Sequence, residues 1–273
     1  MDRYYAPLAR WLASRVERAT KRPFVLGIQG PQGCGKTTLA SALVTAFEDV
    51  GVRSVSVSID DFYLTHAEQR ALAAAHPGNR ALEHRGYPGT HDVALGSRVL
   101  AELRAVGQGG MVRIPSYDKS AHAGRGDRAP ESRWRQVAGP VDLVVVEGWM
   151  LGFSPLSEQA LGAVAASADA ALSVVNEFLR PYGAWTRALD ALVHLDVATL
   201  DTIVTWRVDA ERARRERREP ALSDDDARDY IERFLPAYRA YVPQLRVHPP
   251  CDDFECVTLA ADRQPVESWR APQ

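Results

Sequence analysis

A glycine-rich stretch near the N-terminus constrains the fold of this chain more than any other feature. Residues 30–37 read Gly-Pro-Gln-Gly-Cys-Gly-Lys-Thr and fit the phosphate-loop pattern G-x-x-x-x-G-K-[ST]. Residues 24–28 before the loop read as a short buried strand, and residues 38–44 after it read as a helix. This context separates the motif from a plain glycine-rich turn, because a strand must deliver the loop and a helix N-terminus must direct free N–H groups at phosphate. The stretch therefore predicts a nucleotide site.

Residue types in the loop suit phosphate binding. The glycines permit backbone conformations and close approaches that a Cβ would block. Lys36 supplies a mobile positive charge for the outer phosphates, and the Thr37 hydroxyl is placed to ligate Mg²⁺. The residues expected to bind the nucleotide here are Gly30, Pro31, Gln32, Gly33, Cys34, Gly35, Lys36, Thr37 and Thr38.

Composition narrows the class of protein. The 273 residues are 46% apolar, which is enough for one large α/β domain. The formal charge of −2 comes from mixed charges and argues against a general nucleic-acid or membrane-binding surface. Cys34, Cys251 and Cys256 have neither disulfide-framework nor zinc spacing, which favours a reducing compartment. The N-terminus lacks a signal-peptide core and no apolar run approaches ~20 residues, so we expect a soluble, cytoplasmic protein.

Strand and helix patterns alternate along the chain. Strands are expected at residues 24–28, 54–59, 112–115, 142–148, 191–195 and 256–259. Helices are expected at 4–20, 38–48, 92–106, 207–218 and from 223 onward, with helix-capping signals at Thr65 with Glu68, at Asp92 and at Ser223. The alternation predicts an α/β fold with a doubly wound, mostly parallel sheet flanked by helices.

Acidic residues follow two of the predicted strands. Asp60 and Asp61 end the strand after the first helix, and Glu147 ends a continuous apolar run, as the acid of a Walker B strand does. Ligands of such sheets bind beyond the carboxyl ends of the strands, so these acids are expected near Lys36. The alternative for Asp60 and Asp61 is a solvated strand end or a helix cap.

Two polar loops carry most of the other candidates. Residues 76–92 contain two prolines, three glycines, three histidines and two arginines, which makes a poor core segment and a plausible substrate loop. Residues 116–128 form a second, cationic loop. Because a charged loop residue is usually solvated, a surface role is the alternative for each cation taken alone.

Features beyond the phosphate loop favour a kinase. No Asn-Lys-x-Asp guanine signature appears, which argues against a GTPase, and the chain is short for a multi-domain motor. A kinase needs an acceptor hydroxyl aligned with the γ-phosphate and a carboxylate that orients it or takes its proton. Asp60 and Asp61 are the candidates for that carboxylate.

Several stretches resemble known kinases. Residues 58–63, Ser-Ile-Asp-Asp-Phe-Tyr, are similar to the acceptor-site motif of the phosphoribulokinase/uridine kinase group. Six further segments resemble plant- and fungal-type D-glycerate 3-kinases. They are residues 85–92, 117–120, 124–128, 147–153, 206–207 and 223–241. The resemblance covers most of residues 24–263 and implies ATP-dependent phosphorylation of D-glycerate to 3-phosphoglycerate, with Mg²⁺.

This resemblance also implies residue roles. Asp60 matches the acidic position of the wider group and is the expected base, with Lys36 also catalytic, while Asp61 could hold Mg²⁺ through water. The expected metal ligands are Thr37, Glu147 and Asp60. Glycerate is a small anion with no base to stack, so cations and hydrogen-bond donors must recognise it. The expected substrate-binding residues are Asp61, Tyr63, Arg85, His91, Tyr117, Lys119, Arg125 and Arg128.

An arginine-rich segment follows the predicted strand at 191–195. Its arginines are Arg212, Arg214, Arg215, Arg217 and Arg218. They resemble a lid over the phosphates, expected at residues 205–222, in which Arg212 and Arg215 are the candidates for nucleotide contact. The alternative is a solvated helix whose arginines pair with Glu211, Glu216 and Glu219.

The chain organisation and two further functions complete the expectations. Residues 1–273 are expected to form a single P-loop kinase domain, with an N-terminal helix within residues 1–22. A kinase of another small alcohol, such as a nucleoside or pantothenate, stays open. So does a nucleotide-binding regulatory protein without transfer chemistry. The oligomeric state is not predicted.

Overall fold

A five-stranded sheet runs through the centre of the protein. The structure is a computed structural model that describes residues 2–165 and 171–266. The strands are β1 (Phe24–Gln29), β2 (Ser54–Ser58), β7 (Leu143–Gly148), β8 (Ala191–Val197) and β9 (Asp253–Leu259), in the order β2-β7-β1-β8-β9. Every neighbouring pair is parallel, which confirms the predicted α/β fold with a mostly parallel sheet.

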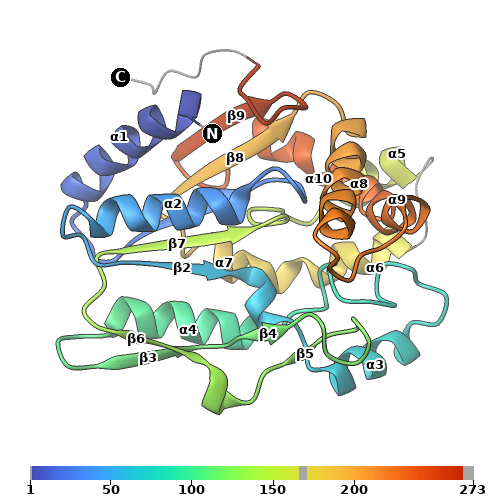
Figure 1. Cartoon of the computed structure of the whole chain (residues 1–273), viewed down its shortest axis with the longest axis horizontal. Helices are drawn as coiled ribbons and strands as arrows, with labels where there is room; N and C mark the ends of the chain where they lie inside the picture. The colour runs from blue at the N-terminus through green and yellow to red at the C-terminus, as the bar shows by residue number, and fades with distance from the viewer. Residues whose placement is uncertain (1, 166–170, 267–273) are drawn as a thin grey trace.

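Helices cover both faces of this sheet (Figure 1), and each packs on it through its apolar side. Helices α1 (Asp2–Arg18) and α2 (Lys36–Glu48) pack on one face, and α4 (Val93–Ala105), α6 (Ala171–Phe178), α7 (Gly183–Thr186) and α10 (Leu235–Val247) contribute to the other. Successive residues of β7 serve the two faces in turn, because side chains of a strand alternate. The continuous apolar run of β7 is thus explained by its burial on both faces.

The remaining elements lie outside the main sheet. They are η1 (Ile59–Phe62), α3 (His66–Ala75), β3 (Met111–Ile114), β4 (Tyr117–Asp118), β5 (Asp127–Arg128), η2 (Glu131–Arg133), β6 (Arg135–Ala138), α5 (Glu158–Ala165), η3 (Arg180–Tyr182), α8 (Asp201–Glu216) and α9 (Asp224–Glu232). Strand β3 pairs antiparallel with β6, and β4 with β5, outside the main sheet.

Several element boundaries differ from the prediction, and two of the differences have a clear physical cause. Strand β2 ends at Ser58 rather than Ile59, because the Ser58 hydroxyl accepts the Asp60 N–H at 3.3 Å and begins the 3₁₀ turn η1. Helix α8 begins at Asp201, six residues before the expected start at 207. Its early residues Ile203 and Trp206 are buried, so this part of the helix is set by packing that the arginine-rich pattern hides.

Predicted capping signals are confirmed. Thr65 and Glu68 form both bonds of a capping box at the start of α3. The side chain of Asp92 accepts the Leu95 N–H at the start of α4, and the side chain of Ser223 accepts the Asp226 N–H at the start of α9.

None of the helices in residues 2–165 and 171–266 has the length and apolar composition that a bilayer crossing requires.

Candidate active site

The phosphate loop joins β1 to α2 in a conformation that needs its glycines. Gly33 and Gly35 have φ values of 84° and 95°. A Cβ on Gly33 would lie 2.9 Å from the Cβ of Trp206, so the loop packs closely on α8. Helix α2 has no side-chain cap at Gly35, and its first N–H groups are therefore available to an anion.

The other loop residues are held by specific contacts. The Lys36 ammonium donates to the Pro31 carbonyl at 3.0 Å, so the lysine arches over the loop. The Cys34 side chain is 1% exposed and packs in the core. Its sulfur lies so close to Gly30 that a Cβ on Gly30 would be only 2.9 Å from it. Burial raises the pKa of the Cys34 thiol. Cys34 therefore packs the loop rather than facing a ligand.

One residue that fixes this loop was missed by the sequence reasoning. The hydroxyl of Tyr238, from α10, donates to the Gln32 side-chain oxygen and accepts the Gln32 N–H at 3.3 Å. The two residues are 206 positions apart in the chain, so no local pattern signals their contact. Tyr238 reads as an ordinary apolar position of a helix from its spacing alone.

Thr37 and Glu147 meet at the end of β7. The Thr37 hydroxyl donates to a Glu147 carboxylate oxygen at 3.0 Å, and Glu147 is only 6% exposed. In the sheet register Glu147 lies between Ile28 of β1 and Ser58 of β2. A hydroxyl and a carboxylate oxygen are ligands that Mg²⁺ accepts, so this pair fits the predicted metal. It also places the acid between the phosphate loop and the turn that carries Asp60.

The paired acids after β2 have different environments. The Lys119 ammonium lies 2.5 Å from an Asp60 carboxylate oxygen, and the Tyr63 hydroxyl also donates to Asp60. Burial would raise the pKa of Asp60, but the charge and hydrogen bond of Lys119 outweigh it and lower the pKa. Burial, with a smaller effect from the charge of Asp60, raises the pKa of Asp61 to about 6. Asp60 therefore stays ionised to lower pH than Asp61.

Three predicted substrate residues form an aromatic wall beside Asp60. The Tyr63 ring lies 4.3 Å from the His91 ring and 5.2 Å from the Tyr117 ring, centroid to centroid. The His91 Nδ1 hydrogen-bonds to the Tyr182 hydroxyl at 2.9 Å, and burial lowers the pKa of His91 to about 3, so the ring is neutral. Within residues 2–165 and 171–266 the buried His91 Nε2 and Tyr117 hydroxyl have no hydrogen-bond partner. Such groups can serve a polar ligand.

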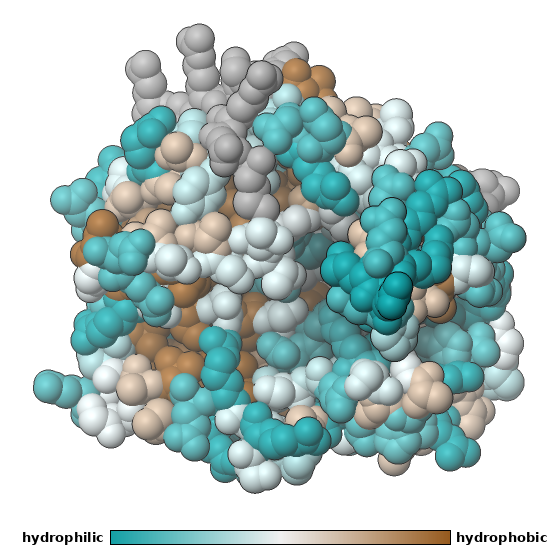
Figure 2. All heavy atoms as spheres, in the orientation of Figure 1, coloured by the Kyte–Doolittle hydropathy of each residue, from teal (hydrophilic) through white to brown (hydrophobic). Residues whose placement is uncertain are grey.

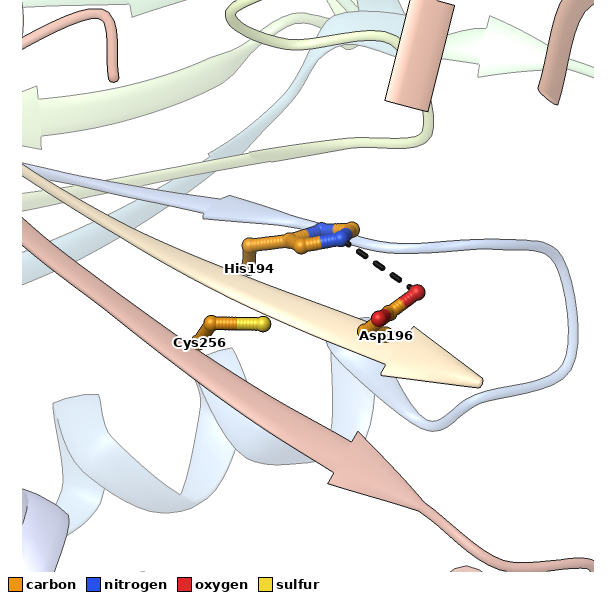
Figure 3. Close-up of side chains that lie close together, drawn as sticks. All are labelled: His194, Asp196 and Cys256. Atoms are coloured by element: carbon orange, nitrogen blue, oxygen red, sulfur yellow. Dashed lines mark ion pairs between the residues drawn. The ribbon is translucent and has the colours of Figure 1, made fainter. Parts of the chain in front are cut away.

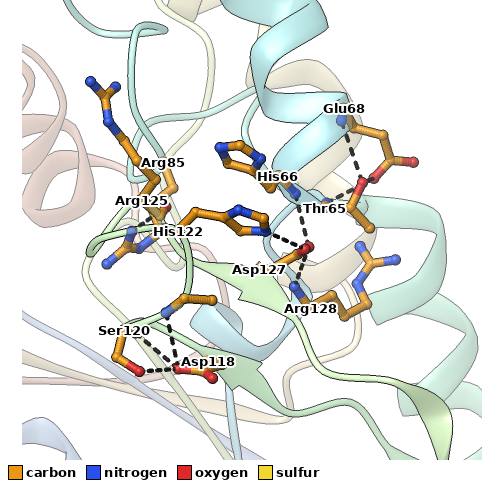
Figure 4. A network of polar contacts seen from close by, with 11 residues as sticks. Thr65, His66, Glu68, Arg85, Asp118, Ser120, His122, Arg125, Asp127 and Arg128 are labelled. Carbon is orange, nitrogen blue, oxygen red and sulfur yellow. Dashed lines mark hydrogen bonds and ion pairs between the residues drawn. The ribbon is translucent and has the colours of Figure 1, made fainter.

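The predicted arginines brace the two polar loops, as Figure 4 shows. The Arg85 guanidinium donates to the carbonyls of Gly124 at 2.8 Å and of Arg125 at 2.5 Å. Arg125 donates to the His84 ring at 2.8 Å. Arg128 donates to the Tyr63 carbonyl at 2.8 Å and lies 3.4 Å from an Asp92 carboxylate oxygen. Of the predicted substrate cations, Lys119 is the one that contacts Asp60.

Another arginine close to this region was not predicted as a site residue. The Arg233 guanidinium lies 4.5 Å from the Tyr230 ring centroid and 4.8 Å from that of Phe234. It donates to the Arg85 carbonyl at 3.4 Å, and its buried Nε has no partner among the described residues. The only signal in the sequence is the three-residue spacing of Tyr230 and Arg233 along one helix, which is too common to indicate a site.

The arginine-rich segment is ion-paired in this conformation. Arg212 lies 2.6 Å from Asp224, and Arg215 pairs with the same carboxylate, while Arg217 lies 2.8 Å from Glu219. Hydrophilic residues gather over α8 and α9 in Figure 2, and the surface is hollowed beside these helices, toward the carboxyl ends of the strands. The predicted lid at 205–222 stays a prediction.

Comparison with known proteins agrees with this geometry. The model of the family described as "Phosphoribulokinase / Uridine kinase family" matches residues 25–162, just over half of the chain. The chain is 38% identical over 277 aligned residues to a protein named "D-glycerate 3-kinase, chloroplastic" from Arabidopsis thaliana, covering 96% of this chain and 60% of that protein. It is 40% identical over 256 residues to "Uncharacterized kinase mug58" from Schizosaccharomyces pombe, covering 90% of this chain and 91% of that protein.

A solved structure is similar over nearly the whole fold. The structure of D-glycerate 3-kinase from Cryptococcus neoformans superposes with a TM-score of 0.87 at 29% identity, covering 96% of this chain and 97% of that one. The chain spans only 60% of the length of the plant relative. The similarity thus extends from the phosphate loop through the arginine-rich helices to β9.

Proposed function

This chain belongs to the phosphoribulokinase/uridine kinase family, and we propose that it transfers the γ-phosphoryl group of ATP to D-glycerate, giving 3-phosphoglycerate. The observation that carries the proposal is the contact between Lys119 and Asp60 at the end of β2. It joins the cationic loop to a carboxylate in the turn that follows β2, and so combines a base with a positive charge suited to an anionic acceptor. Similarity over 96% of this chain to two proteins named D-glycerate 3-kinase supports the choice of acceptor.

The nucleotide half of the reaction rests on the phosphate loop. Lys36 and the N–H groups at the start of α2 would bind the phosphates and stabilise the charge that develops during transfer. The chemistry that Mg²⁺ would supply here is positive charge that neutralises part of the phosphate charge. Thr37 and Glu147 are the residues proposed to hold the metal, because their oxygens already lie 3.0 Å apart. Asp60 is the further candidate ligand.

In the acceptor half, Asp60 would orient the hydroxyl and take its proton. An ionised carboxylate can accept the hydrogen bond of the acceptor hydroxyl, and the proton leaves late in a loose phosphoryl-transfer transition state. The environment of Asp60 keeps it ionised to lower pH than Asp61, whose pKa is about 6, and Asp60 is the acid that contacts Lys119. We therefore assign the base to Asp60 rather than to Asp61.

Recognition of the acceptor carboxylate is proposed for the cationic loops. Lys119 provides the charge beside Asp60, and the Arg125 guanidinium donates to the neutral His84 ring rather than to a carboxylate. The unpartnered His91 Nε2 and Tyr117 hydroxyl can hydrogen-bond the polar groups of a small acceptor. Arg85 and Arg128 have most of their donors committed to backbone carbonyls and Asp92, so we propose that they position the loops.

The arginine-rich segment at 205–222 is proposed to close over the phosphates. Arg212 and Arg215 share Asp224 as their partner in this conformation. A nucleotide phosphate could replace that carboxylate with a stronger, multiply charged acceptor. Closure would exclude water, which competes with the acceptor hydroxyl.

The three free cysteines fit a reducing compartment, and we propose a cytoplasmic location for the reaction.

An acceptor panel tests the proposed substrate. The measurement is kcat/KM for D-glycerate, glycerol, uridine and pantothenate under saturating Mg-ATP. Glycerol leaves a cation unpaired in a closing site, which costs about 1.5–3 kcal/mol and corresponds to roughly ten- to over a hundred-fold in kcat/KM. D-glycerate should therefore exceed glycerol by that factor, and the bulky uridine should react more slowly still.

Two arginine variants accompany the panel. Arg125→Ala should weaken D-glycerate use more than glycerol use, because it removes a candidate carboxylate ligand. Arg85→Ala removes the bonds to Gly124 and Arg125 and should impair both acceptors by loosening the loop. A faster reaction with uridine or pantothenate than with D-glycerate, or equal rates for glycerol and D-glycerate, would refute the proposed substrate.

A further inference from the structure

A polar cluster lies on the sheet at the opposite side of β1 from Glu147. His194 and Asp196 belong to β8, and Cys256 belongs to β9, where it is the register partner of His194 (Figure 3). Side chains two residues apart on a strand share a face, and register partners lie side by side. The His194 nitrogen, the Cys256 sulfur and an Asp196 oxygen lie within 4.8 Å of one another. No sequence spacing suggests this grouping.

The tautomer of His194 follows from its neighbours. The Gln29 side-chain NH₂ donates to the Trp149 carbonyl at 2.6 Å, because a carbonyl can only accept. The Gln29 oxygen therefore faces His194 Nδ1, which must donate to it. In the neutral ring the lone pair is then on Nε2, the atom that points toward Asp196 in Figure 3.

This arrangement leaves two electron-rich atoms facing each other. His194 is 1% exposed and Asp196 is 4% exposed, and His194 Nε2 has no hydrogen-bond partner in the described part of the chain. It lies 3.5 Å from the Asp196 oxygen. A cation placed between this lone pair and the carboxylate oxygen would attract both atoms.

We propose that His194, Asp196 and Cys256 form a three-ligand binding site for a borderline divalent cation such as Zn²⁺. Imidazole and thiolate favour Zn²⁺ over Mg²⁺, which prefers oxygen ligands. A tetrahedral zinc site with bonds of about 2.0–2.3 Å separates its ligand atoms by roughly 3.3–3.8 Å. The His194–Asp196 separation of 3.5 Å falls in that range.

Neighbouring residues provide the outer contacts that such a site needs. Gln29 fixes the His194 ring through Nδ1, and Arg246 of α10 pairs with the second oxygen of Asp196. The Phe254 ring stacks on His194 at 6.4 Å between centroids. Cys256 is partly exposed, so a cation can reach the cluster and its thiol can lose a proton to solvent on binding.

The cluster is connected to the phosphate loop through one residue. Gln29, the last residue of β1, directly precedes Gly30, and its NH₂ group bonds to the residue that follows Gly148 of β7. A cation on Nε2 would strengthen the Nδ1–H bond to Gln29 by polarising the ring. The bound cation therefore stabilises the start of the loop without contacting Thr37 or Glu147.

Cobalt binding tests the site independently of catalysis. Metal-stripped protein is titrated with Co²⁺, a spectroscopic substitute for Zn²⁺, in excess Mg²⁺ to occupy oxygen-rich sites. The expected result is one Co²⁺ per chain with a thiolate-to-cobalt charge-transfer band that Zn²⁺ abolishes. Cys256→Ser should lose this band and weaken Co²⁺ binding by at least the 10- to 100-fold typical for loss of a supporting contact. The matched control is Cys251→Ser, which replaces another partly buried cysteine and should keep the band.

A second measurement uses the unaltered chain, in case Cys256→Ser folds poorly. Zn²⁺ should slow the alkylation of Cys256 by iodoacetamide and leave the rate at Cys251 unchanged, as read by peptide mass spectrometry. The proposal is overturned by a cobalt complex without a thiolate band, by a band that survives in folded Cys256→Ser, or by equal alkylation of Cys256 with and without Zn²⁺.

Discussion

Replacing Lys119 by methionine tests the central pair of the proposed active site. Lys119 lies 2.5 Å from Asp60, with side-chain exposures of 58% and 28%. An exposed ion pair contributes about 0–1 kcal/mol, and a hydrogen bond to a charged group contributes about 1.5–3 kcal/mol. The half-buried geometry of this pair places its loss at roughly 1–2 kcal/mol, or about 5- to 30-fold in kcat/KM at neutral pH. Methionine keeps an unbranched side chain of similar length and removes the ammonium group, with its charge and its hydrogen bond to Asp60.

The pH dependence gives this prediction its sign. The folded pKa of Asp60 is depressed because Lys119 outweighs the effect of burial. Without Lys119, burial remains and the pKa of Asp60 rises, so the base is protonated over more of the acidic range. The acidic limb of kcat/KM against pH should therefore move to higher pH in Lys119→Met. Lys21→Met, a change at an exposed lysine beyond α1, should leave the profile unchanged.

The assay separates two roles for Lys119. If the lysine acts through Asp60, kcat falls for D-glycerate and glycerol alike. If it acts only on the acceptor carboxylate, D-glycerate alone is affected, and mainly in KM. An acidic limb that stays in place in Lys119→Met, with unchanged kcat for both acceptors, would show that the pair does not tune the base.

The other predictions concern the residues around the phosphates. Lys36→Ala should remove most phosphoryl transfer with an unchanged thermal midpoint, because the Lys36 ammonium donates to the Pro31 carbonyl of its own loop rather than to the core; unchanged kcat/KM would exclude the nucleotide role. Asp60→Asn should lower kcat by ~10²–10⁴-fold and Asp61→Asn by less, and the reverse order would reassign the base. Glu147→Gln should raise the Mg²⁺ concentration needed for half-maximal rate, measured at fixed ATP, and a Mg²⁺ requirement identical to the unaltered chain would remove Glu147 from the metal site.

Local sequence patterns determined much of the framework. The order of strand, glycine loop and helix at residues 24–48 depends on short-range conformational preferences, and β1 and α2 form where the pattern predicted them. Capping residues such as Asp92 and Ser223 act on N–H groups three residues away, so their effect is readable from neighbours in the sequence. The apolar run before Glu147 likewise required only that both faces of β7 be covered.

Contacts between distant segments were decided by the tertiary structure alone. Lys119 and Asp60 are 59 positions apart, so their contact depends on how the loop at 116–128 folds back toward the turn after β2. Arg85 bonds to a backbone carbonyl of the same loop, and no side-chain pattern indicates where that carbonyl lies. His194 and Cys256 become neighbours only through the register of β8 and β9. Sequence spacing describes one segment at a time, whereas a site is formed by the packing that brings several segments together, and that packing is a property of the whole fold.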